Sequence, residues 1–275
     1  MTLFYLAVID ISEYITYKLS NNSLKKEFYK NRDAKRKILL GGLVGGIILD
    51  GTLQWLGKFW IYPFWSTFFY ISIFVIGFAF YFLTILESYI VVKTVLDYFR
   101  KGKKYITKPY KYEKNLFRFF VIVGIVLLFL GISMLIYNYS KVGGYVFNIR
   151  EQIHLDSTLS TVGVFLTFFG IWLILEYLLH KKSENSMIST ALHGYYIPLL
   201  ATFISAYVLL AFMESLNGPL LLWDYVNVPW GHIKVFSMPV LGVVGWPFQN
   251  IGVVSLYALI FHKDENILIA GDMIE

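Results

Sequence analysis

The sequence has no cysteine, so it can form no disulfide bond, no thiolate metal site and no cysteine nucleophile. Charged residues are also scarce, at 15% of 275 residues. The five histidines form no HxxxH or HExxH pair, which disfavours haem and di-metal chemistry. A Gly-rich phosphate loop is missing too, because GGLVGG at 41–46 lies inside an apolar stretch, where close helix packing explains it better. We therefore expect neither a metal nor a cofactor.

Long apolar stretches dominate what is present. Hydrophobic residues make up 57% of the chain and aromatic residues 19%, and the mean hydropathy is +0.61, far from a soluble average. These stretches recur at about the length that crosses a hydrocarbon core of roughly 30 Å. The sequence therefore predicts an all-α integral membrane protein with seven transmembrane helices. The predicted spans are 2–18, 38–57, 66–92, 117–138, 159–180, 194–215 and 234–261, and Gly-Trp-Pro at 245–247 with Pro239 predicts a kinked or broken last helix.

One segment of the sequence occurs twice. Ile11–Ser23 (ISEYITYKLSNNS) and Ile174–Ser186 (ILEYLLHKKSENS) share seven of thirteen residues at an offset of 163. The same offset aligns Trp60-Ile-Tyr62 with Trp223-Asp-Tyr225. Periods this long are typical of duplicated membrane bundles and not of solenoid repeats. Chance similarity between two membrane segments is the alternative.

The duplication organises the whole chain. Segment 2–18 carries Asp10 and Glu13 and taken alone looks like an interfacial amphipathic helix, but its repeat partner 159–180 reads as a clear span, so we predict that both cross the membrane. The start shows no basic n-region and no small-residue cleavage site, so a cleaved signal peptide is not expected. We predict two parallel three-helix repeats joined by a linker helix. Residues 1–92 form the first repeat, 93–158 the basic cytoplasmic loop plus the linker helix, and 159–275 the second repeat and a cytoplasmic tail.

Lys and Arg are distributed unevenly over the predicted loops. Of the 24 such residues, twenty fall in loops 18–37, 93–118 and 180–193 and in the tail. The positive-inside rule then predicts a multi-pass protein of the cell membrane with its N-terminus outside and its C-terminus in the cytoplasm. We interpret loop 93–118, rich in Lys and aromatic residues, as touching anionic headgroups, and expect no nucleic-acid partner. The four basic residues of the outer loops are Lys58, Lys141, Arg150 and Lys234.

Acidic residues inside predicted spans are candidate functional positions, because they are costly in a bilayer. Asp50 and Glu214 stand out, since each lies in the outward half of the second helix of its repeat and precedes a Trp-x-Tyr by nine or ten residues. We predict that they form a catalytic acid–base pair facing one cavity. In the alternative, each has a structural role and hydrogen-bonds a broken helix near Gly51 or Gly218.

A second set of polar residues is assigned a structural or secondary role. Glu13 and Glu176 are equivalent in the two repeats and are predicted to face the bundle interior near the ends of their helices. Glu87 falls at the position equivalent to the uncharged Asn250. Buried polar groups without partners are costly, so we expect substitutions of this set to harm folding more than specificity.

The candidate acids suit one type of reaction. Hydration or cyclisation of a polyene begins with protonation of a C=C bond by a carboxylic acid held neutral, and desolvation favours that form. Trp and Tyr rings stabilise the resulting carbocation through cation–π attraction. The candidate lining residues are Trp60, Tyr62, Trp223 and Tyr225. The same four residues also fit an aromatic belt at the membrane interface, which is the alternative.

An acid, then Trp-x-Tyr, then Pro sixteen residues after the Trp is a pattern that resembles the membrane lycopene cyclase domain of carotenoid biosynthesis. Glu214, Trp223, Tyr225 and Pro239 hold these places. That family also fuses two parallel three-helix units through a linker helix. Its Pro-x-Glu-Glu box is missing, because Pro239 continues as Val-Leu-Gly, which argues against a true β-cyclase. The pattern is more similar to the carotenoid hydratase family of the bacterioruberin pathway, with Trp246 seven residues after Pro239.

The resemblance implies a membrane-embedded enzyme that modifies an isoprenoid or carotenoid, a hydratase, lyase or cyclase that needs no cofactor. Glu214 is the expected proton donor, Asp50 is expected to position water or take the proton back, and Trp246 adds a ring beside the substrate. The expected partners are the lipid bilayer and a long-chain isoprenoid or carotenoid. Two alternatives stay open: a non-catalytic carrier or transporter of lipid or isoprenoid, and an accessory subunit of a membrane complex.

Overall fold

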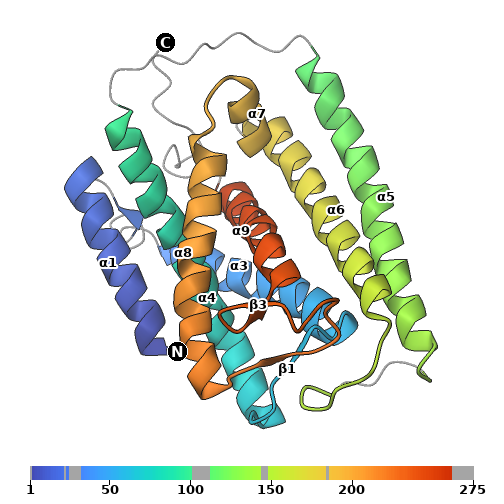
Figure 1. Cartoon of the computed structure of the whole chain (residues 1–275). Coiled ribbons are helices and arrows are strands. Elements are labelled where there is room, and N and C mark those ends of the chain that lie inside the picture. Colours follow the sequence, from blue (N-terminus) through green and yellow to red (C-terminus); the bar gives the residue numbers. More distant parts are fainter. Residues whose placement is uncertain are drawn as a thin grey trace.

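The structure, a computed structural model, describes residues 2–21, 23–24, 32–100, 112–143, 148–183 and 186–261. Most of the long helices run alongside one another, one long helix crosses behind them, and short strands lie at one end of the bundle (Figure 1). The α-helices are α1 (Thr2–Ser20), α3 (Arg32–Asp50), α4 (Thr67–Phe99), α5 (Glu113–Ser140), α6 (Ser157–Ser183), α7 (Met187–Leu192), α8 (Ile197–Leu220) and α9 (Val240–Phe261). A π-helical segment, η1 (Gly51–Leu56), extends α3. The strands are β1 (Trp60–Ile61), β2 (Asp224–Tyr225), β3 (Lys234–Val235) and β4 (Met238–Pro239).

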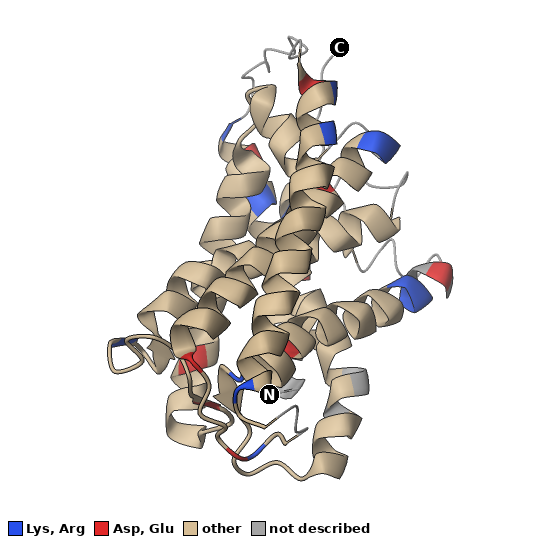
Figure 2. Ribbon diagram, turned by 90° about the vertical axis from the view of Figure 1, so that its right-hand side faces the viewer, with Lys and Arg blue, Asp and Glu red and all other residues tan. Residues whose placement is uncertain are grey.

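Six of the described helices are long and apolar enough to cross a membrane, so the chain is a multi-pass membrane protein by helix length and composition. Figure 2 shows that charged residues gather toward the two ends of the molecule and at the tip of one helix that projects to the right, and that they are few elsewhere. α1 is not among the six, because Asp10, Glu13 and Lys18 place three charges in its 19 residues. The seventh span and the orientation stay predictions, and much of loop 93–118 and of the tail lies outside the described residues. The six segments are Lys35–Leu56, Gly77–Phe99, Glu113–Ser140, Ser157–Lys182, Ile197–Leu220 and Val240–Phe261.

The helices pack in a pattern that repeats. α4 packs against α1, α3 and α8, and α9 packs against α6, α8 and α3. The contacts of α4 with α1, α3 and α8 thus correspond to the contacts of α9 with α6, α8 and α3, respectively. α5 stands outside this pattern and packs along α6, at one side of the molecule (Figure 1).

Glycines allow two of these helix pairs to approach closely. A Cβ atom on Gly42 of α3 would lie 2.5 Å from the Cα of Ala79 in α4, so the GGLVGG segment serves helix packing, as predicted. In the α5–α6 pair, a Cβ atom on Gly131 would lie 2.6 Å from the carbonyl oxygen of Gly163. Larger side chains at these positions would push the helices apart.

The last helix begins later than predicted and is not broken. Residues 234–239, assigned to the last span from the sequence, form a hairpin of β3 and β4. Pro239 closes that hairpin, because proline cannot lie in a helix interior without losing a hydrogen bond, and α9 starts at the next residue. Pro247 is accommodated inside α9, which is continuous from Val240 to Phe261. Of the two predicted forms of this helix, kinked or broken, the broken form is therefore wrong, and the kink stays a prediction.

Candidate functional site

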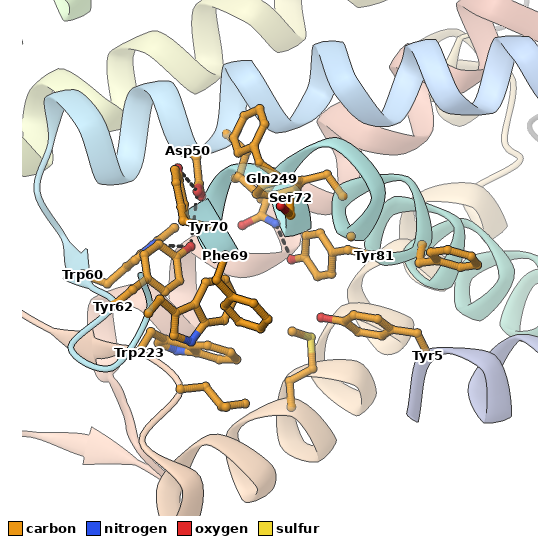
Figure 3. Close-up of a pocket in the computed structure, with 18 of the residues that line it drawn as sticks. Tyr5, Asp50, Trp60, Tyr62, Phe69, Tyr70, Ser72, Tyr81, Trp223 and Gln249 are labelled. Atoms are coloured by element: carbon orange, nitrogen blue, oxygen red, sulfur yellow. Dashed lines mark hydrogen bonds between the residues drawn. The ribbon is translucent and has the colours of Figure 1, made fainter. Parts of the chain in front are cut away.

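One cavity of about 520 Å³ lies among α1, α3, α4, α8 and α9, beside the paired strands β1 and β2 (Figure 3). Aromatic rings form most of its wall. Of the two predicted catalytic acids, Asp50 lines the cavity and Glu214 does not. The predicted site residues that the structure brings together here are Asp50, Trp60, Tyr62, Trp223, Tyr225 and Trp246.

Two turns bring the Trp-x-Tyr segments together. β1 and β2 pair in antiparallel fashion, with Trp60 opposite Tyr225. The residue two positions before each Trp has a left-handed backbone: φ is 50° at Lys58 and 45° at Leu221. Such values are uncommon for residues other than glycine, and here they redirect the chain where each preceding helical segment ends. The two left-handed positions are also 163 residues apart, the offset found in the sequence.

Asp50 ends α3, and its side chain is buried, with 1% of its surface exposed. Its Oδ2 accepts hydrogen bonds from the hydroxyls of Tyr70 at 2.9 Å and Tyr62 at 3.2 Å. Each tyrosine accepts one from an indole N–H, Trp55 to Tyr70 at 2.7 Å and Trp60 to Tyr62 at 2.9 Å. The Asp50 side chain makes no capping hydrogen bond to η1. The alternative in which it only stabilises a broken helix therefore lacks the contact that it requires.

Glu214 lies in α8 and is equally buried. The hydroxyl of Tyr225 donates to its Oε1 at 2.8 Å, and the indole N–H of Trp223 donates to the Tyr225 hydroxyl at 3.0 Å. Oε2 of Glu214 accepts a hydrogen bond from the Ser237 hydroxyl and a second one, at 3.5 Å, from Asn217 Nδ2. Tyr225 lines the cavity and Glu214 lies behind it. The prediction that both acids face one cavity is therefore wrong for Glu214.

The same order of groups thus occurs twice: an indole N–H donates to a tyrosine hydroxyl, which donates to a carboxyl group. Burial raises the pKa of both Tyr62 and Tyr225 well above their usual range, and the nearby carboxyl group, Asp50 or Glu214 respectively, adds to this effect. Both side chains therefore stay neutral at physiological pH and are hydrogen-bond donors to their acids.

α4 supplies the long wall of the cavity with side chains that sequence reasoning missed. Tyr70, Phe74, Phe78 and Tyr81 all line the cavity, and their spacing places them on one face of the helix. The centroids of neighbouring rings are 5.7, 4.8 and 6.2 Å apart along this series. The periodicity is present in the sequence, but so many other aromatic residues surround it that this face does not stand out.

The second set of predicted polar residues lies outside this cavity. Glu176 is fully buried and accepts hydrogen bonds from Trp172 Nε1 at 3.1 Å and from the backbone N–H of Ile188 at 3.0 Å. It therefore joins α6 to α7, which fits a structural role. Within the described part of the chain, no group of three His, Asp or Glu side chains is arranged to hold a metal ion. Glu13, Glu87 and Asn250 are also buried.

Neither a protein-family model, nor a curated protein, nor a solved structure matches the chain. The chemistry of the site must therefore be argued from the cavity and from the groups that face it.

Proposed function

We propose that the chain is a membrane-embedded enzyme that protonates a C=C bond of a long-chain isoprenoid or carotenoid and so catalyses its hydration or cyclisation. The observation that carries the proposal is the composition of the cavity. Among the described residues, Asp50 is the one charged side chain that lines it, and Trp, Tyr and Phe rings form most of the rest. An apolar wall with one reactive polar group suits a polyene, which offers nothing but π bonds to recognise.

The reaction that these groups support begins at the Asp50 carboxyl. No Lys, Arg or His of the described chain forms an ion pair with it, and an unpaired carboxylate in an apolar cavity is costly, so the neutral acid is the resting form. Its proton moves to one alkene carbon, the π electron pair forms the new C–H bond, and the adjacent carbon becomes a cation. The hydroxyls of Tyr62 and Tyr70 then stabilise the carboxylate that is left.

The cation has two possible fates in this cavity. Water can add to it, or a second C=C bond of the same substrate can attack it and close a ring. In both cases the product cation loses a proton, which returns to the Asp50 carboxylate and restores the acid. Ring faces stabilise the cation meanwhile. One of these is Trp65, which also lines the cavity and stacks on Tyr62 with ring centroids 4.6 Å apart.

Asp50 replaces Glu214 as the proton donor in this proposal, because only Asp50 borders the space in which a substrate could lie. Glu214 becomes a positioning residue. It holds the hydroxyl of Tyr225 on the side away from the cavity, so that the ring of Tyr225 faces the substrate.

The proposal includes the finer architecture: seven spans in two parallel three-helix repeats joined by α5, in the cell membrane with the N-terminus outside and the C-terminus in the cytoplasm. Three observations support the duplication. They are the exchangeable pattern of helix neighbours, the twofold occurrence of the Trp–Tyr–acid order, and the left-handed residues Lys58 and Leu221.

Expression in a host that produces both lycopene and hydroxylated carotenoids, followed by chromatography and mass spectrometry of the pigments, tests the proposed activity. Cells with the wild-type chain should form a pigment that has gained one water or has cyclised without a change in mass. Asp50→Asn should form none, because an amide cannot donate this proton. Asp224→Asn is the matched control, since Asp224 neighbours Tyr225 but does not line the cavity. No new pigment with the wild type, or full activity of Asp50→Asn, would contradict the proposal.

A carrier that binds an isoprenoid without chemistry is the second candidate. It is favoured by one observation: Glu214, the predicted second member of the acid–base pair, does not reach the cavity. The two functions differ in what they need from Asp50. A carrier with Asp50→Asn would still bind and release its ligand, whereas the enzyme would bind substrate and leave it unchanged.

A further inference from the structure

A second polar site lies in the same cavity, formed by Tyr5 of α1, Tyr81 of α4 and Gln249 of α9. Each of these side chains lines the cavity and is 7% exposed. Gln249 Nε2 donates a hydrogen bond to the Tyr81 hydroxyl at 2.7 Å, and the ring centroids of Tyr5 and Tyr81 are 6.1 Å apart. Figure 3 shows Tyr5 and Tyr81 near one another and away from Asp50.

Part of the hydrogen-bonding capacity of this site has no protein partner within the described chain. The Tyr5 hydroxyl makes no hydrogen bond, the Tyr81 hydroxyl accepts one but donates none, and Gln249 Oε1 accepts none. The Tyr5 hydroxyl and Gln249 Oε1 are not enclosed by protein, and all three residues line the cavity. Buried polar groups are normally paired, and three that face one cavity indicate a polar group on the ligand.

We propose that Tyr5, Tyr81 and Gln249 bind a neutral oxygen, a hydroxyl or a carbonyl, on the isoprenoid that occupies the cavity. This inference rests on the proposed function and narrows its substrate class from a plain hydrocarbon to an oxygenated isoprenoid. Two hydroxyl donors and one amide acceptor match such an oxygen. Among the described residues, no Lys, Arg or His lines the cavity, so a phosphate or carboxylate would find no positive partner among them and would be left as an uncompensated buried charge.

The two polar sites stand at a defined spacing along α4. Tyr70, which contacts Asp50, and Tyr81 are eleven residues apart on this helix. Eleven residues make about three turns, so both residues lie on one face of α4, with their Cα atoms about 16 Å apart along the axis. The rings of Phe74 and Phe78 form the wall between them.

The lining of the cavity includes exposed residues near the first site. Tyr5, Tyr81 and Gln249 are buried, whereas Phe69 and Ser72, which also line the cavity, are exposed on the first turns of α4. An isoprenoid longer than the cavity would thus hold its oxygenated end inside and extend past Asp50 toward lipid.

Binding of two matched probes to the purified full chain in lipid nanodiscs tests this inference. The probes are geranylgeraniol and the hydrocarbon with the same carbon skeleton but no hydroxyl, and quenching of the fluorescence of the cavity tryptophans reports binding. The wild type should bind the alcohol about tenfold more tightly, and Tyr5→Phe with Tyr81→Phe should reduce this preference to about twofold without weakening the hydrocarbon. Replacing the alcohol by the aldehyde distinguishes a hydroxyl from a carbonyl ligand.

The controls keep the result interpretable. Tyr207→Phe removes a hydroxyl from an exposed position of α8 and should keep the full preference. Tyr5→Phe alone removes a hydroxyl without a protein partner in the described chain, so it should fold normally and still lose about half of the preference on a logarithmic scale. Equal wild-type affinity for both probes, or an unchanged preference in the double variant, overturns the inference. Asp50→Asn should keep the preference, so failure of the proposed catalysis and failure of this site give different results.

Discussion

The two Trp–Tyr–acid clusters share one order of hydrogen bonds but differ in what surrounds the acid. Asp50 borders a cavity of about 520 Å³ and accepts from two tyrosine hydroxyls. Glu214 is enclosed, and Tyr225, Ser237 and Asn217 occupy its two oxygens. On the side of α6 and α9, Tyr225 borders only a smaller cavity of about 80 Å³. The same local arrangement therefore holds an accessible acid in one half and an enclosed acid in the other.

The difference follows from the length of the chain after each Trp-x-Tyr. Tyr62 is followed by α4 only five positions later, at Thr67, whereas Tyr225 is followed by α9 at Val240. The longer connection contains the β3–β4 hairpin, and Ser237 at its turn reaches Glu214. In the duplicated arrangement that we propose, a longer connection in one half is thus sufficient to enclose its acid, and two copies of the sequence need not give two accessible acids.

The largest expected difference between the two acids is in turnover. Asp50→Asn should lower product formation in the pigment assay by at least about a hundredfold, because no other group of the described cavity can donate the proton. Glu214→Gln keeps an acceptor for Tyr225 and should leave most of the product. If Glu214→Gln were the inactive variant and Asp50→Asn the active one, the assignment of the donor would be reversed.

The second difference is in stability. Glu214→Leu leaves the donors of Tyr225 and Asn217 without an acceptor and leaves the Ser237 hydroxyl only the backbone carbonyl of residue 214, so it should lower the free energy of unfolding by about 2–4 kcal/mol. Glu214→Gln should cost about 1 kcal/mol or less, since an amide oxygen still accepts. Thermal unfolding in detergent, followed by circular dichroism, compares the two variants. Equal losses for Leu and Gln would show that charge, and not the pairing of these donors, is what matters at this position.

A smaller effect tests the role of the hairpin alone. Ser237→Ala removes one donor to Glu214 and should cost about 1 kcal/mol of stability while leaving turnover unchanged. Ser215→Ala is the control, because that hydroxyl is exposed and bonds only within its own helix, to the carbonyl of Ala211. A drop in turnover in Ser237→Ala without a change in stability would indicate that Glu214 takes part in the chemistry.

The smallest effect concerns the residues that begin the two turns. Lys58 is buried, with its Nζ donating to the carbonyl of Asn148, and burial lowers its pKa to about 8, whereas Leu221 is exposed. Between pH 8 and the pKa of about 10.5 in the unfolded chain, Lys58 is protonated in the unfolded state but largely neutral in the folded state. The unfolded state therefore binds more protons in this window, so the contribution of Lys58 to the free energy of unfolding should rise with pH. The difference in melting temperature between the wild type and Lys58→Met should therefore change across this window. The difference between the wild type and Leu221→Lys should not, because an exposed lysine keeps the same pKa in both states.

Much of the fold follows from apolar length, and part of the site follows from spacing. Six predicted spans coincide with described helices to within several residues, because crossing a bilayer requires continuous apolar sequence. Asp50, Trp60 and Tyr62 could be predicted as cavity residues, because an acid in an apolar run and a repeated Trp-x-Tyr are rare in a sequence of this composition. Each of these signals lies in a short stretch of sequence, so it predicts single elements and residues and not the contacts between distant segments.

The missed features depend on contacts between distant segments. Tyr81 and Gln249 are 168 positions apart, and neither residue is unusual in its own helix. The enclosure of Glu214 depends on where the β3–β4 hairpin folds back, and its residues were assigned to a helix from their hydropathy. The late start of α9 and the exclusion of Glu214 from the cavity are therefore one error with one cause.

The register of β1 and β2 has a further consequence. Trp60 lies opposite Tyr225 and Ile61 opposite Asp224, so in the duplicated arrangement that we propose the pairing is symmetric about the Ile61–Asp224 pair. A strand with this register can pair equally well with a second copy of itself, as subunits do across an isologous interface. A protein with a single repeat would therefore build the same pairing as a homodimer with two identical acids. In one fused chain the two halves can differ in sequence, so that one acid can stay open to a ligand while the other is enclosed and supports the fold.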